Sequence, residues 1–228
     1  MNSKVVQSVT PVLLVGGGEV DDAVLRQALG AAEVVVAADG GAARVLALGR
    51  MPDAVYGDMD SLAPAVQAQL DPGVLRAITE QDSTDFDKCL RHIEAPLVFG
   101  YGFLGKRLDH QLAAMTVLAK RPDRRCILIG TEDLALICPP DLSLDLQPGT
   151  RLSLYPMAPS TGRSEGLRWP IDGLTFTTAG TIGTSNETTG PVRLTMDGPG
   201  MMLILPVACL SELLAGLAAS PSAWPVRA

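Results

Sequence analysis

The chain is short of the residues on which several common protein classes depend. Lysine and arginine together number 18, against 25 aspartates and glutamates, and the formal charge is -7. A broad nucleic-acid-binding surface needs clustered cations that displace counterions from phosphates, so this balance argues against nucleic acid as a partner. A protein this acidic would need a bound cation to hold a phosphate group.

Long apolar runs and paired cysteines are also missing. No apolar run approaches the roughly 20 residues that span a bilayer, and the N-terminal sequence MNSKVVQSVT lacks the apolar region of a signal peptide. We therefore expect a cytoplasmic protein with no membrane partner. The cysteines at positions 89, 126, 138 and 209 lack the paired spacing of a metal site, so we expect reduced and mostly buried thiols.

The chain has 228 residues, 47% of them hydrophobic, which is enough for a sizeable core. Up to about residue 140, strand-like runs such as VLLV, VVVAA and CILI alternate with helix-like stretches, a pattern typical of an α/β domain with a mostly parallel sheet and flanking helices. Beyond it, short segments such as LSLDL, LTFTT and MMLILP are separated by turns, as in an all-β sandwich.

We therefore predict two domains: an α/β domain over residues 1–140 and a β-sandwich over residues 141–228. The Pro139-Pro140 pair is the expected hinge. The segment SELLAGLAAS near the end is expected to be a short helix or a frayed tail.

Aspartates recur just after the predicted strands. Asp39 follows VVVAA, Asp58 follows AVYG, and Asp109 follows LVFGYG after a short loop. Ligands of α/β sheets gather in the crevice beyond the carboxyl ends of the strands, so these side chains are expected to converge there. The arrangement suggests a magnesium and phosphate site.

Residues 82–93 predict an amphipathic helix with an apolar stripe and a capping box in its first turn. Asp85 and Lys88 share another face, with Asp82 in the preceding loop, so two carboxylates and an ammonium would share a small volume. A capped helix start with an ordinary ion pair explains the same residues, and the sequence leaves both interpretations open.

The sequence GDMDS places Asp58 and Asp60 on either side of one residue. Two carboxylates this close repel unless a cation neutralises them, and Mg²⁺ does so while keeping waters and phosphate oxygens as further ligands. An aspartate-rich turn bonded to its own backbone is the alternative. Gly40 and Gly41, after Asp39, either form an ordinary turn or let a backbone approach a ligand.

The segment GYGFLGKRLDH combines the glycines Gly102 and Gly105 with a guanidinium, Arg107, just before a predicted helix. Backbone N–H groups and a guanidinium suit phosphate oxygens, although Asp109 could equally be a helix N-cap. His110 is a rival general base or a structural histidine. The glycine turn after VLLV meets neither the dinucleotide fingerprint nor the P-loop pattern.

Taken in order, the motifs ADGGA, GDMDS, DSTDFDK, GxxGxRLDH and GTSN make the chain resemble the thiamin pyrophosphokinase (thiamine diphosphokinase) family over about residues 12–206. The resemblance implies an α/β domain that binds ATP and Mg²⁺, a β-sandwich that binds thiamine, and usually a homodimer with active sites between subunits. The implied reaction gives thiamine diphosphate and AMP. Ala43, Lys106 and Ala114 depart from the family pattern but remove no carboxylate.

The resemblance also implies roles for individual residues. The magnesium set would be Asp58, Asp60 and Asp82. Thiamine would lie beside Ser185 and Asn186, with Trp169 as a stacking surface. The residues around ATP and the reacting hydroxyl would be Asp39, Gly40, Gly41, Asp85, Lys88, Gly102, Gly105, Arg107 and Asp109.

These residues permit in-line attack by the substrate alcohol on the β-phosphorus of ATP, with Mg²⁺ on Asp58, Asp60 and Asp82 against the phosphate oxygens. Lys88 and Arg107 would offset the negative charge that builds on the oxygen leaving with AMP. Asp85 or Asp109 would accept the hydroxyl proton. Two alternatives stay open: a magnesium-dependent phosphohydrolase with Asp58 as nucleophile, and a non-catalytic nucleotide-binding module.

Overall fold

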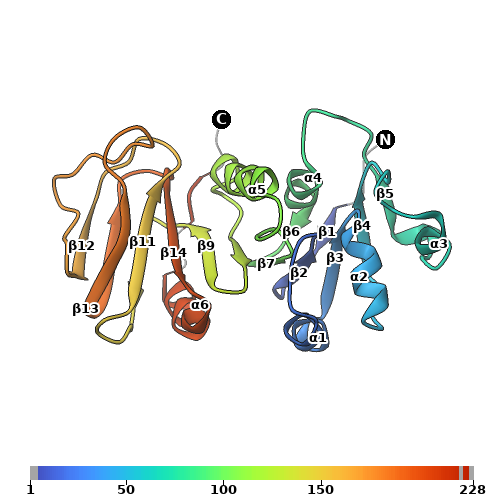
Figure 1. Cartoon of the computed structure of the whole chain (residues 1–228), viewed down its shortest axis with the longest axis horizontal. Helices are drawn as coiled ribbons and strands as arrows, with labels where there is room; N and C mark the ends of the chain where they lie inside the picture. Colours follow the sequence, from blue (N-terminus) through green and yellow to red (C-terminus); the bar gives the residue numbers. More distant parts are fainter. Residues whose placement is uncertain (1–4, 221–222, 226–228) are drawn as a thin grey trace. The chain divides into compact units, whose positions relative to one another are not determined.

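The computed structural model describes residues 5–220 and 223–225, and the chain divides into two compact units (Figure 1). The first unit comprises residues 1–117 and 126–131, and the second comprises residues 118–125 and 132–228. Both units contain strands and at least one helix, so the predicted combination of sheet and helices in two parts is present.

The first unit combines a sheet with short helices. Its elements, in chain order, are β1 (Val6–Gln7), β2 (Val12–Val15), α1 (Asp22–Ala31), β3 (Val34–Ala38), α2 (Gly41–Ala47), β4 (Ala54–Gly57), α3 (Pro64–Gln67), the 3-10 helix η1 (Pro72–Val74), β5 (Leu75–Ala77), α4 (Asp85–Arg91), β6 (Ile93–Glu94), β7 (Val98–Tyr101), α5 (Leu108–Lys120), whose last turn passes into the second unit, and β8 (Cys126–Ile129).

The strand pairs of the main sheet in this unit are parallel, in the order β8-β7-β2-β3-β4-β5. In chain order this sheet begins with β2, continues with β3, β4 and β5 on one side, and then adds β7 and β8 on the other side of β2. In open α/β sheets the ligand crevice forms beyond the carboxyl ends of the strands at such a reversal. The topology therefore places the expected crevice beside β2.

The strands of this sheet are continuous apolar runs in the sequence because both of their faces are buried. Strands β2, β4 and β8 are buried at every position, as parallel strands covered on both faces must be. Helix α2 packs against β2 and β3, and α4 packs against β3 and β4. Helix α1 begins at the cap residue Asp21, whose carboxylate accepts the N–H groups of Ala23 and Val24 at 2.8 and 3.0 Å.

The predicted amphipathic helix forms as α4. The hydroxyl oxygen of Thr84 accepts the N–H of Asp87 at 3.2 Å, which confirms the predicted cap. The helix ends at Arg91, so the last residue of the predicted stripe lies in β6. The whole stripe is nonetheless buried: Phe86, Cys89, Leu90 and Ile93.

The second unit is built mainly from antiparallel strands. After the end of α5, its elements are β9 (Asp133–Ile137), β10 (Asp141–Leu144), β11 (Arg151–Pro156), β12 (Gly162–Leu167), β13 (Gly183–Met196), β14 (Met201–Pro206), the 3-10 helix η2 (Val207–Cys209) and α6 (Leu210–Ala219). Strand β13 pairs with β11 in its first part and with β10 and β12 further along. Helix α6 packs against β10 and forms from the segment expected to be a helix or a tail.

Two local expectations in this unit differ from the structure. The run LTFTT is not a strand, because only isolated bridges form at Phe176. Conversely β12, with the polar sequence GRSEGL, is a strand because β13 supplies its hydrogen bonds. The predicted hinge, Pro139 and Pro140, lies between β9 and β10.

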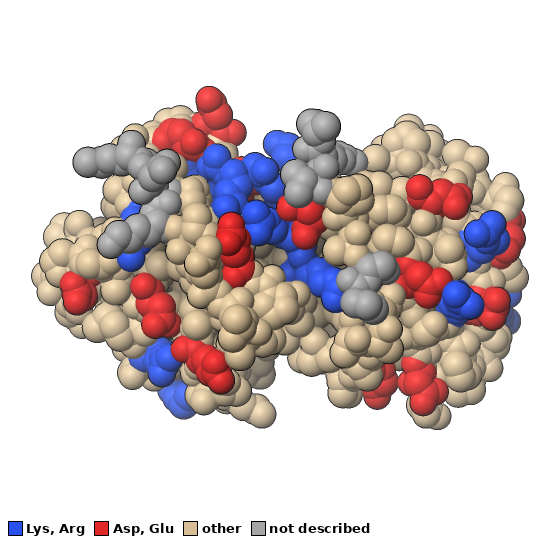
Figure 2. All heavy atoms as spheres, turned by 180° about the vertical axis from the view of Figure 1, so that it is seen from behind, with Lys and Arg blue, Asp and Glu red and all other residues tan. Residues whose placement is uncertain are grey.

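The four cysteines are free and buried, as expected, and burial raises the pKa of each thiol. On the face shown in Figure 2, acidic side chains are scattered among basic and uncharged ones, so the negative net charge does not form a uniform acidic surface. Among the described residues, no helix has the length and apolarity needed to cross a bilayer.

Alanine substitutions at two glycines of the first unit are expected to change its free energy of unfolding in opposite directions. At Gly41 a Cβ would lie 2.1 Å from the carbonyl oxygen of Val15, whereas at Gly30, inside α1, nothing lies within 4 Å. We expect Gly41→Ala to lower the free energy of unfolding by at least about 2 kcal/mol. We expect Gly30→Ala to raise it by about 0.5–1 kcal/mol, because alanine loses less backbone entropy in a helix. Urea denaturation measures both, and a Gly41→Ala variant as stable as the wild type would contradict the close approach of α2 to β2.

Candidate functional site

Loops at the carboxyl ends of β2 and β7 lie in direct contact. Gly16 donates its N–H to the carbonyl of Tyr101, and Gly18 donates to that of Gly102, both at 2.8 Å. A Cβ at Gly18 would lie 2.4 Å from the carbonyl oxygen of Gly102, and Gly102 itself has a φ of 75°. The two turns can pack this closely only because they are built from glycine.

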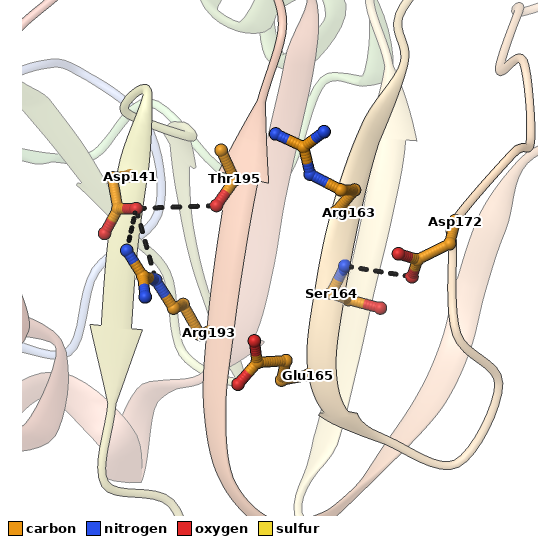
Figure 3. Close-up of a pocket in the computed structure, with 7 residues that line it drawn as sticks. All are labelled: Asp141, Arg163, Ser164, Glu165, Asp172, Arg193 and Thr195. Atoms are coloured by element: carbon orange, nitrogen blue, oxygen red, sulfur yellow. Dashed lines mark hydrogen bonds and ion pairs between the residues drawn. The ribbon is translucent and has the colours of Figure 1, made fainter.

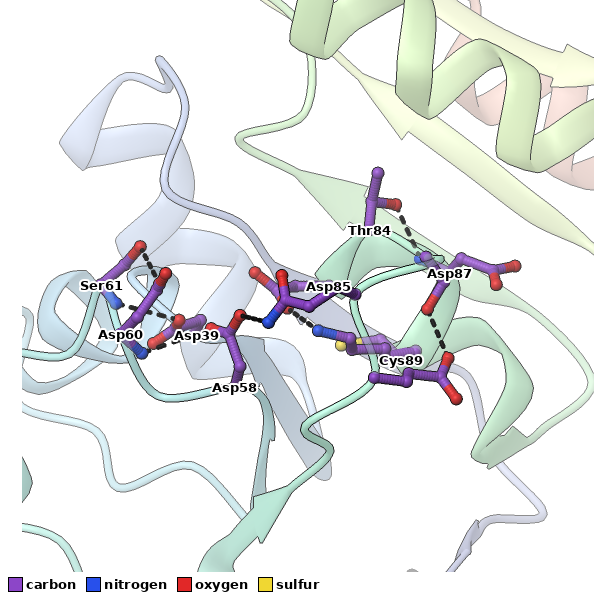
Figure 4. Close-up of polar contacts among 12 residues, drawn as sticks. Asp39, Asp58, Asp60, Ser61, Thr84, Asp85, Asp87 and Cys89 are labelled. Carbon is purple, nitrogen blue, oxygen red and sulfur yellow. Dashed lines mark hydrogen bonds and ion pairs between the residues drawn. The ribbon is translucent and has the colours of Figure 1, made fainter.

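Three aspartates converge at the ends of the neighbouring strands β3 and β4 (Figure 4). Each of Asp39, Asp58 and Asp60 offers a carboxylate oxygen, and these atoms all lie within 4.8 Å of one another. Gly57, the last residue of β4, permits this approach, because a Cβ there would lie 2.7 Å from the Cβ of Asp39. We call these three side chains the carboxylate cluster.

Hydrogen bonds from the turn after β4 order the carboxylate cluster. The N–H of Ser61 donates to Oδ2 of Asp39 at 3.2 Å, and its hydroxyl donates to Oδ1 of Asp60 at 3.0 Å. The N–H of Asp60 donates to Oδ1 of Asp58 at 3.3 Å. Asp39 and Met59 adopt positive φ values of 33° and 69°, so the backbone is constrained where the carboxylates meet. The turn is therefore bonded to its own backbone, yet it also gathers charge.

Asp39 is the buried member of the carboxylate cluster, with 1% of its surface exposed. Its pKa is raised to about 6, first by burial and then by repulsion from Asp85, Asp58 and Asp60, while the N–H of Ser61 acts in the opposite direction. Among the described residues, Oδ1 of Asp39 has no hydrogen-bond partner. A buried carboxylate oxygen without a donor, beside two more carboxylates, has the environment of a cation ligand.

The chemistry of these donors fits a hard divalent cation. Three carboxylates supply only oxygen ligands, which suit Mg²⁺ and similar ions rather than zinc or copper. The resemblance to the family implied Asp58, Asp60 and Asp82 as the metal set. The structure brings the first two together with Asp39 instead, whereas Asp82 is exposed in the loop before α4. A metal role for Asp82 stays a prediction.

Asp85 and Lys88 form an ion pair at the edge of the carboxylate cluster, with Nζ and Oδ1 3.0 Å apart. The Lys88 side chain is only 3% exposed, so its ammonium lies away from bulk water. The pKa of Asp58 is lowered by the N–H of Asp60 first, then by the amide of Gln81 at 3.1 Å, and also by Lys88. The predicted pairing of Asp85 with Lys88 is therefore present, whereas a place for Asp82 beside them stays a prediction.

Arg107 and Asp109 pair through two hydrogen bonds, Nε to Oδ1 at 3.1 Å and Nη2 to Oδ2 at 2.6 Å. The pairing lowers the pKa of Asp109 and raises that of Arg107. Because α5 begins at Leu108, Asp109 lies in its first turn and is not the N-cap. Both side chains are exposed, as is His110, and within the described part of the chain their contacts do not reach the carboxylate cluster.

The three predicted thiamine-side residues lie in the second unit. The amide of Asn186 donates to the carbonyl of Trp169 at 2.7 Å and accepts its N–H at 3.2 Å, so the two are held together. Trp169 is 54% exposed, and the guanidinium carbon of Arg168 lies 4.9 Å from the centroid of its ring. Ser185 is exposed and has a φ of 60°.

Sequence reasoning missed several residues that order the site. Gly57 and Ser61 stand inside the motif GDMDS, and Gln81 begins QDSTDFDK, but no spacing rule distinguishes them from ordinary turn residues. Their roles appear only when β4 and the loop before α4 are placed together.

A separate hollow of about 340 Å³ lies on the polar face of β10, β12 and β13 (Figure 3). Arg193 pairs with Asp141 at 2.9 Å, and Asp172 accepts the N–H of Ser164 at 3.2 Å. Polar groups of this hollow thus largely bond to one another. None of its residues was predicted to have a role.

Comparisons with known proteins agree for both parts of the chain. Residues 25–129 match the model described as "Thiamin pyrophosphokinase, catalytic domain", and residues 141–199 match "Thiamin pyrophosphokinase, vitamin B1 binding domain". Thiamine pyrophosphokinase 3 of Oryza sativa subsp. japonica is 30% identical over 203 residues, which cover 73% of this chain and 76% of the relative. Thiamine pyrophosphokinase 2 of Arabidopsis thaliana is also 30% identical, over 155 residues that cover 59% of this chain and 58% of the relative.

Solved structures share the fold. The thiamin pyrophosphokinase of yeast superposes with a TM-score of 0.73 at 16% identity, covering 89% of this chain and 88% of the yeast chain. The Bacillus subtilis enzyme superposes with a TM-score of 0.69 at 20% identity, covering 86% and 98%. With the ordered motifs, the carboxylate cluster and these matches in hand, the chain belongs to the thiamin pyrophosphokinase family.

Proposed function

We propose that the protein transfers a diphosphate group from ATP to the hydroxyl of thiamine, giving thiamine diphosphate and AMP. The observation that carries this proposal is the carboxylate cluster of Asp39, Asp58 and Asp60 at the strand ends of a chain in this family. Relatives that bear the name thiamine pyrophosphokinase support the same reaction.

Asp39, Asp58 and Asp60 hold the divalent cation in this proposal, which we take to be Mg²⁺, and Asp82 approaches from the loop before α4. Bound Mg²⁺ supplies positive charge to the phosphate oxygens of ATP. The unpartnered Oδ1 of Asp39 and the all-oxygen donor set support the assignment. Backbone N–H groups of the loops at Gly40, Gly41, Gly102 and Gly105, and the guanidinium of Arg107, then contact the nucleotide.

In the transfer step, the thiamine hydroxyl oxygen bonds to the β-phosphorus while the bond from that phosphorus to the AMP oxygen breaks. The buried ammonium of Lys88 opposes the negative charge that grows on the leaving oxygen, and a desolvated charge does this effectively. The hydroxyl proton goes to Asp85 or Asp109. Asp85 is the better placed acceptor, because it lies beside the carboxylate cluster, whereas the two described hydrogen bonds of the Asp109 carboxylate go to Arg107, which it orients.

The second unit receives thiamine in this proposal. The exposed ring of Trp169 offers a stacking surface to the cationic thiazolium or the pyrimidine, Ser185 lies beside it, and Asn186 holds the Trp169 backbone. We also propose that strands β9 to β14 form a sandwich, because β13 pairs with β11 and then with β10 and β12. A homodimer in the cytoplasm completes the proposal.

The test is to incubate purified protein with ATP, Mg²⁺ and thiamine, and to resolve nucleotides and thiamine species by chromatography. We expect AMP and thiamine diphosphate in equal amounts, and neither product when thiamine is omitted. ADP with thiamine monophosphate would mean attack at the γ-phosphorus. Phosphate release without thiamine would favour the phosphohydrolase, and ATP binding without turnover would favour the nucleotide-binding module.

Replacing one cation ligand should separate catalysis from folding. We expect Asp58→Asn to keep the fold and to lower kcat by at least about a hundredfold, as expected for the loss of one electrostatic element. Asp172→Asn, at a carboxylate that accepts a backbone N–H in the second unit, is the control and should keep wild-type turnover. Near-normal kcat in Asp58→Asn would remove this residue from the cation site.

The raised pKa of Asp39 predicts how stability depends on pH. Because the folded state raises this pKa to about 6, the native protein binds the proton more readily than the unfolded chain. The carboxyl therefore favours folding at low pH, and that contribution is lost as pH rises through about 6. At pH 7.5, without Mg²⁺ or nucleotide, we expect Asp39→Asn to unfold with a free energy higher by roughly 2–3 kcal/mol, although it loses activity.

The measurement is urea denaturation of Asp39→Asn and the wild type at pH 7.5 and again at pH 4. The difference between the two proteins should shrink at pH 4, where most wild-type Asp39 is protonated. A variant that is less stable than the wild type at pH 7.5 would show that the ionised carboxyl is not under electrostatic stress.

A further inference from the structure

The loop over residues 78–84 joins β5 to α4, and one of its side chains, Gln81, contacts Asp58 of the proposed cation site. Its first residue is anchored by the N–H of Ile78, which donates to the carbonyl of Gly57 at 2.8 Å. Its last residue is anchored by the Thr84 cap of α4. Between these anchors the loop has no helix or strand, so side chains must fix its conformation.

Arg91, in the last turn of α4, supplies that connection. Its Nη2 donates to Oε1 of Glu80 and, at 3.2 Å, to the hydroxyl of Ser83, while the Ser83 hydroxyl donates to the same Glu80 oxygen at 2.5 Å. Nε of Arg91 lies 3.3 Å from Oδ2 of Asp87 on the helix. The guanidinium therefore bridges the helix and the loop, and one Glu80 oxygen receives both donors.

The same loop reaches the carboxylate cluster one residue further on. The amide of Gln81 donates to Oδ2 of Asp58 at 3.1 Å (Figure 4 shows Asp58 beside the start of α4). Gln81 is adjacent to Glu80 in the chain, so a loop fixed at Glu80 also fixes where the Gln81 amide can lie. No other described hydrogen bond joins this loop to an aspartate of the cluster.

We propose that the Arg91–Glu80 pair is a latch that holds residues 78–84 where Gln81 can orient Asp58, and that it thereby sets the affinity of the carboxylate cluster for a divalent cation. This inference rests on the cation site of the proposed function. Arg91 and Glu80 are positioning residues in it, because they contact the loop and not the cation. Partners that orient metal ligands in this way commonly change metal affinity by about 10–100-fold.

The exposure of the Arg91–Glu80 latch distinguishes a role in positioning the loop from a role in the global stability of the fold. The side chains of Arg91 and Glu80 are 28% and 41% exposed, so water screens the pair and its contribution to global stability is small. The three-way bond between Arg91, Ser83 and Glu80 restricts geometry, and Glu80 has a lowered pKa in keeping with its two donors. Breaking the latch should therefore loosen the loop without unfolding the protein.

The test uses Mn²⁺ as the probe, titrated into the full-length protein at pH 7.5 without ATP or thiamine, with free Mn²⁺ measured by electron paramagnetic resonance. We expect Arg91→Leu and Glu80→Gln each to raise the Kd by about tenfold, and the double variant to raise it no further, because both changes break one interaction. Arg193→Leu, which breaks a similar ion pair with Asp141 in the second unit, is the matched control and should leave the Kd unchanged.

Hydrogen exchange gives a second readout that needs neither metal nor turnover. Amides of residues 78–84 should exchange faster in Arg91→Leu and Glu80→Gln than in the wild type, while the strands of the sheet keep their protection. If the wild type binds Mn²⁺ and both variants bind it equally well, or if their effects add in full, the latch is wrong and the proposed function stands. If the wild type itself binds no Mn²⁺, the cation site is wrong, and this proposal is overturned with it.

Discussion

The repulsion among carboxylates at the ends of β3 and β4 is the constraint that the surrounding structure must accommodate. Asp39, Asp58 and Asp60 present oxygens within 4.8 Å of one another, with Asp85 close enough to raise the pKa of Asp39 further. One buried ammonium, from Lys88, pairs with Asp85 and also lowers the pKa of Asp58. The repulsion that remains is relieved by a proton on Asp39, whose pKa is raised to about 6, and in the proposed function by a bound divalent cation.

Backbone packing forces these groups together. Strands β3 and β4 are parallel neighbours, so their carboxyl ends meet at one edge of the sheet and the residues after them share that edge. Gly57 removes the side chain that would separate Asp39 from β4, and the glycines at 16, 18 and 102 let the adjoining turns close on one another. The free energy that holds the carboxylates together therefore comes from the buried apolar strands behind them, whose burial stabilises the fold.

The sequence predicted the parts of this site that local rules govern. The α4 cap and its apolar stripe follow from spacing within one helix, and the aspartates after β3 and β4 follow from the rule for strand ends. It could not rank Asp39 above Asp82 as a member of the carboxylate cluster, because that depends on which loop reaches the edge of β4. Gln81 and Arg91 were missed for the same reason, since each acts through a contact between segments. Likewise β12 was missed because its strand depends on pairing with β13 and not on an apolar alternation of its own.

The electrostatic repulsion within the carboxylate cluster also couples ligand binding to folding. A cation that binds the folded cluster and not the unfolded chain adds RT ln(1 + [L]/Kd) to stability, about 2.7 kcal/mol at a hundredfold excess over Kd. Part of that stabilisation comes from relief of the carboxylate repulsion that helps to raise the pKa of Asp39. Loops around the cluster can then be less stable than the sheet without unfolding the protein, because a bound ligand stabilises them. The loop before α4 fits this description: partly exposed ion pairs and single hydrogen bonds hold it in place, whereas β4 is buried at every position.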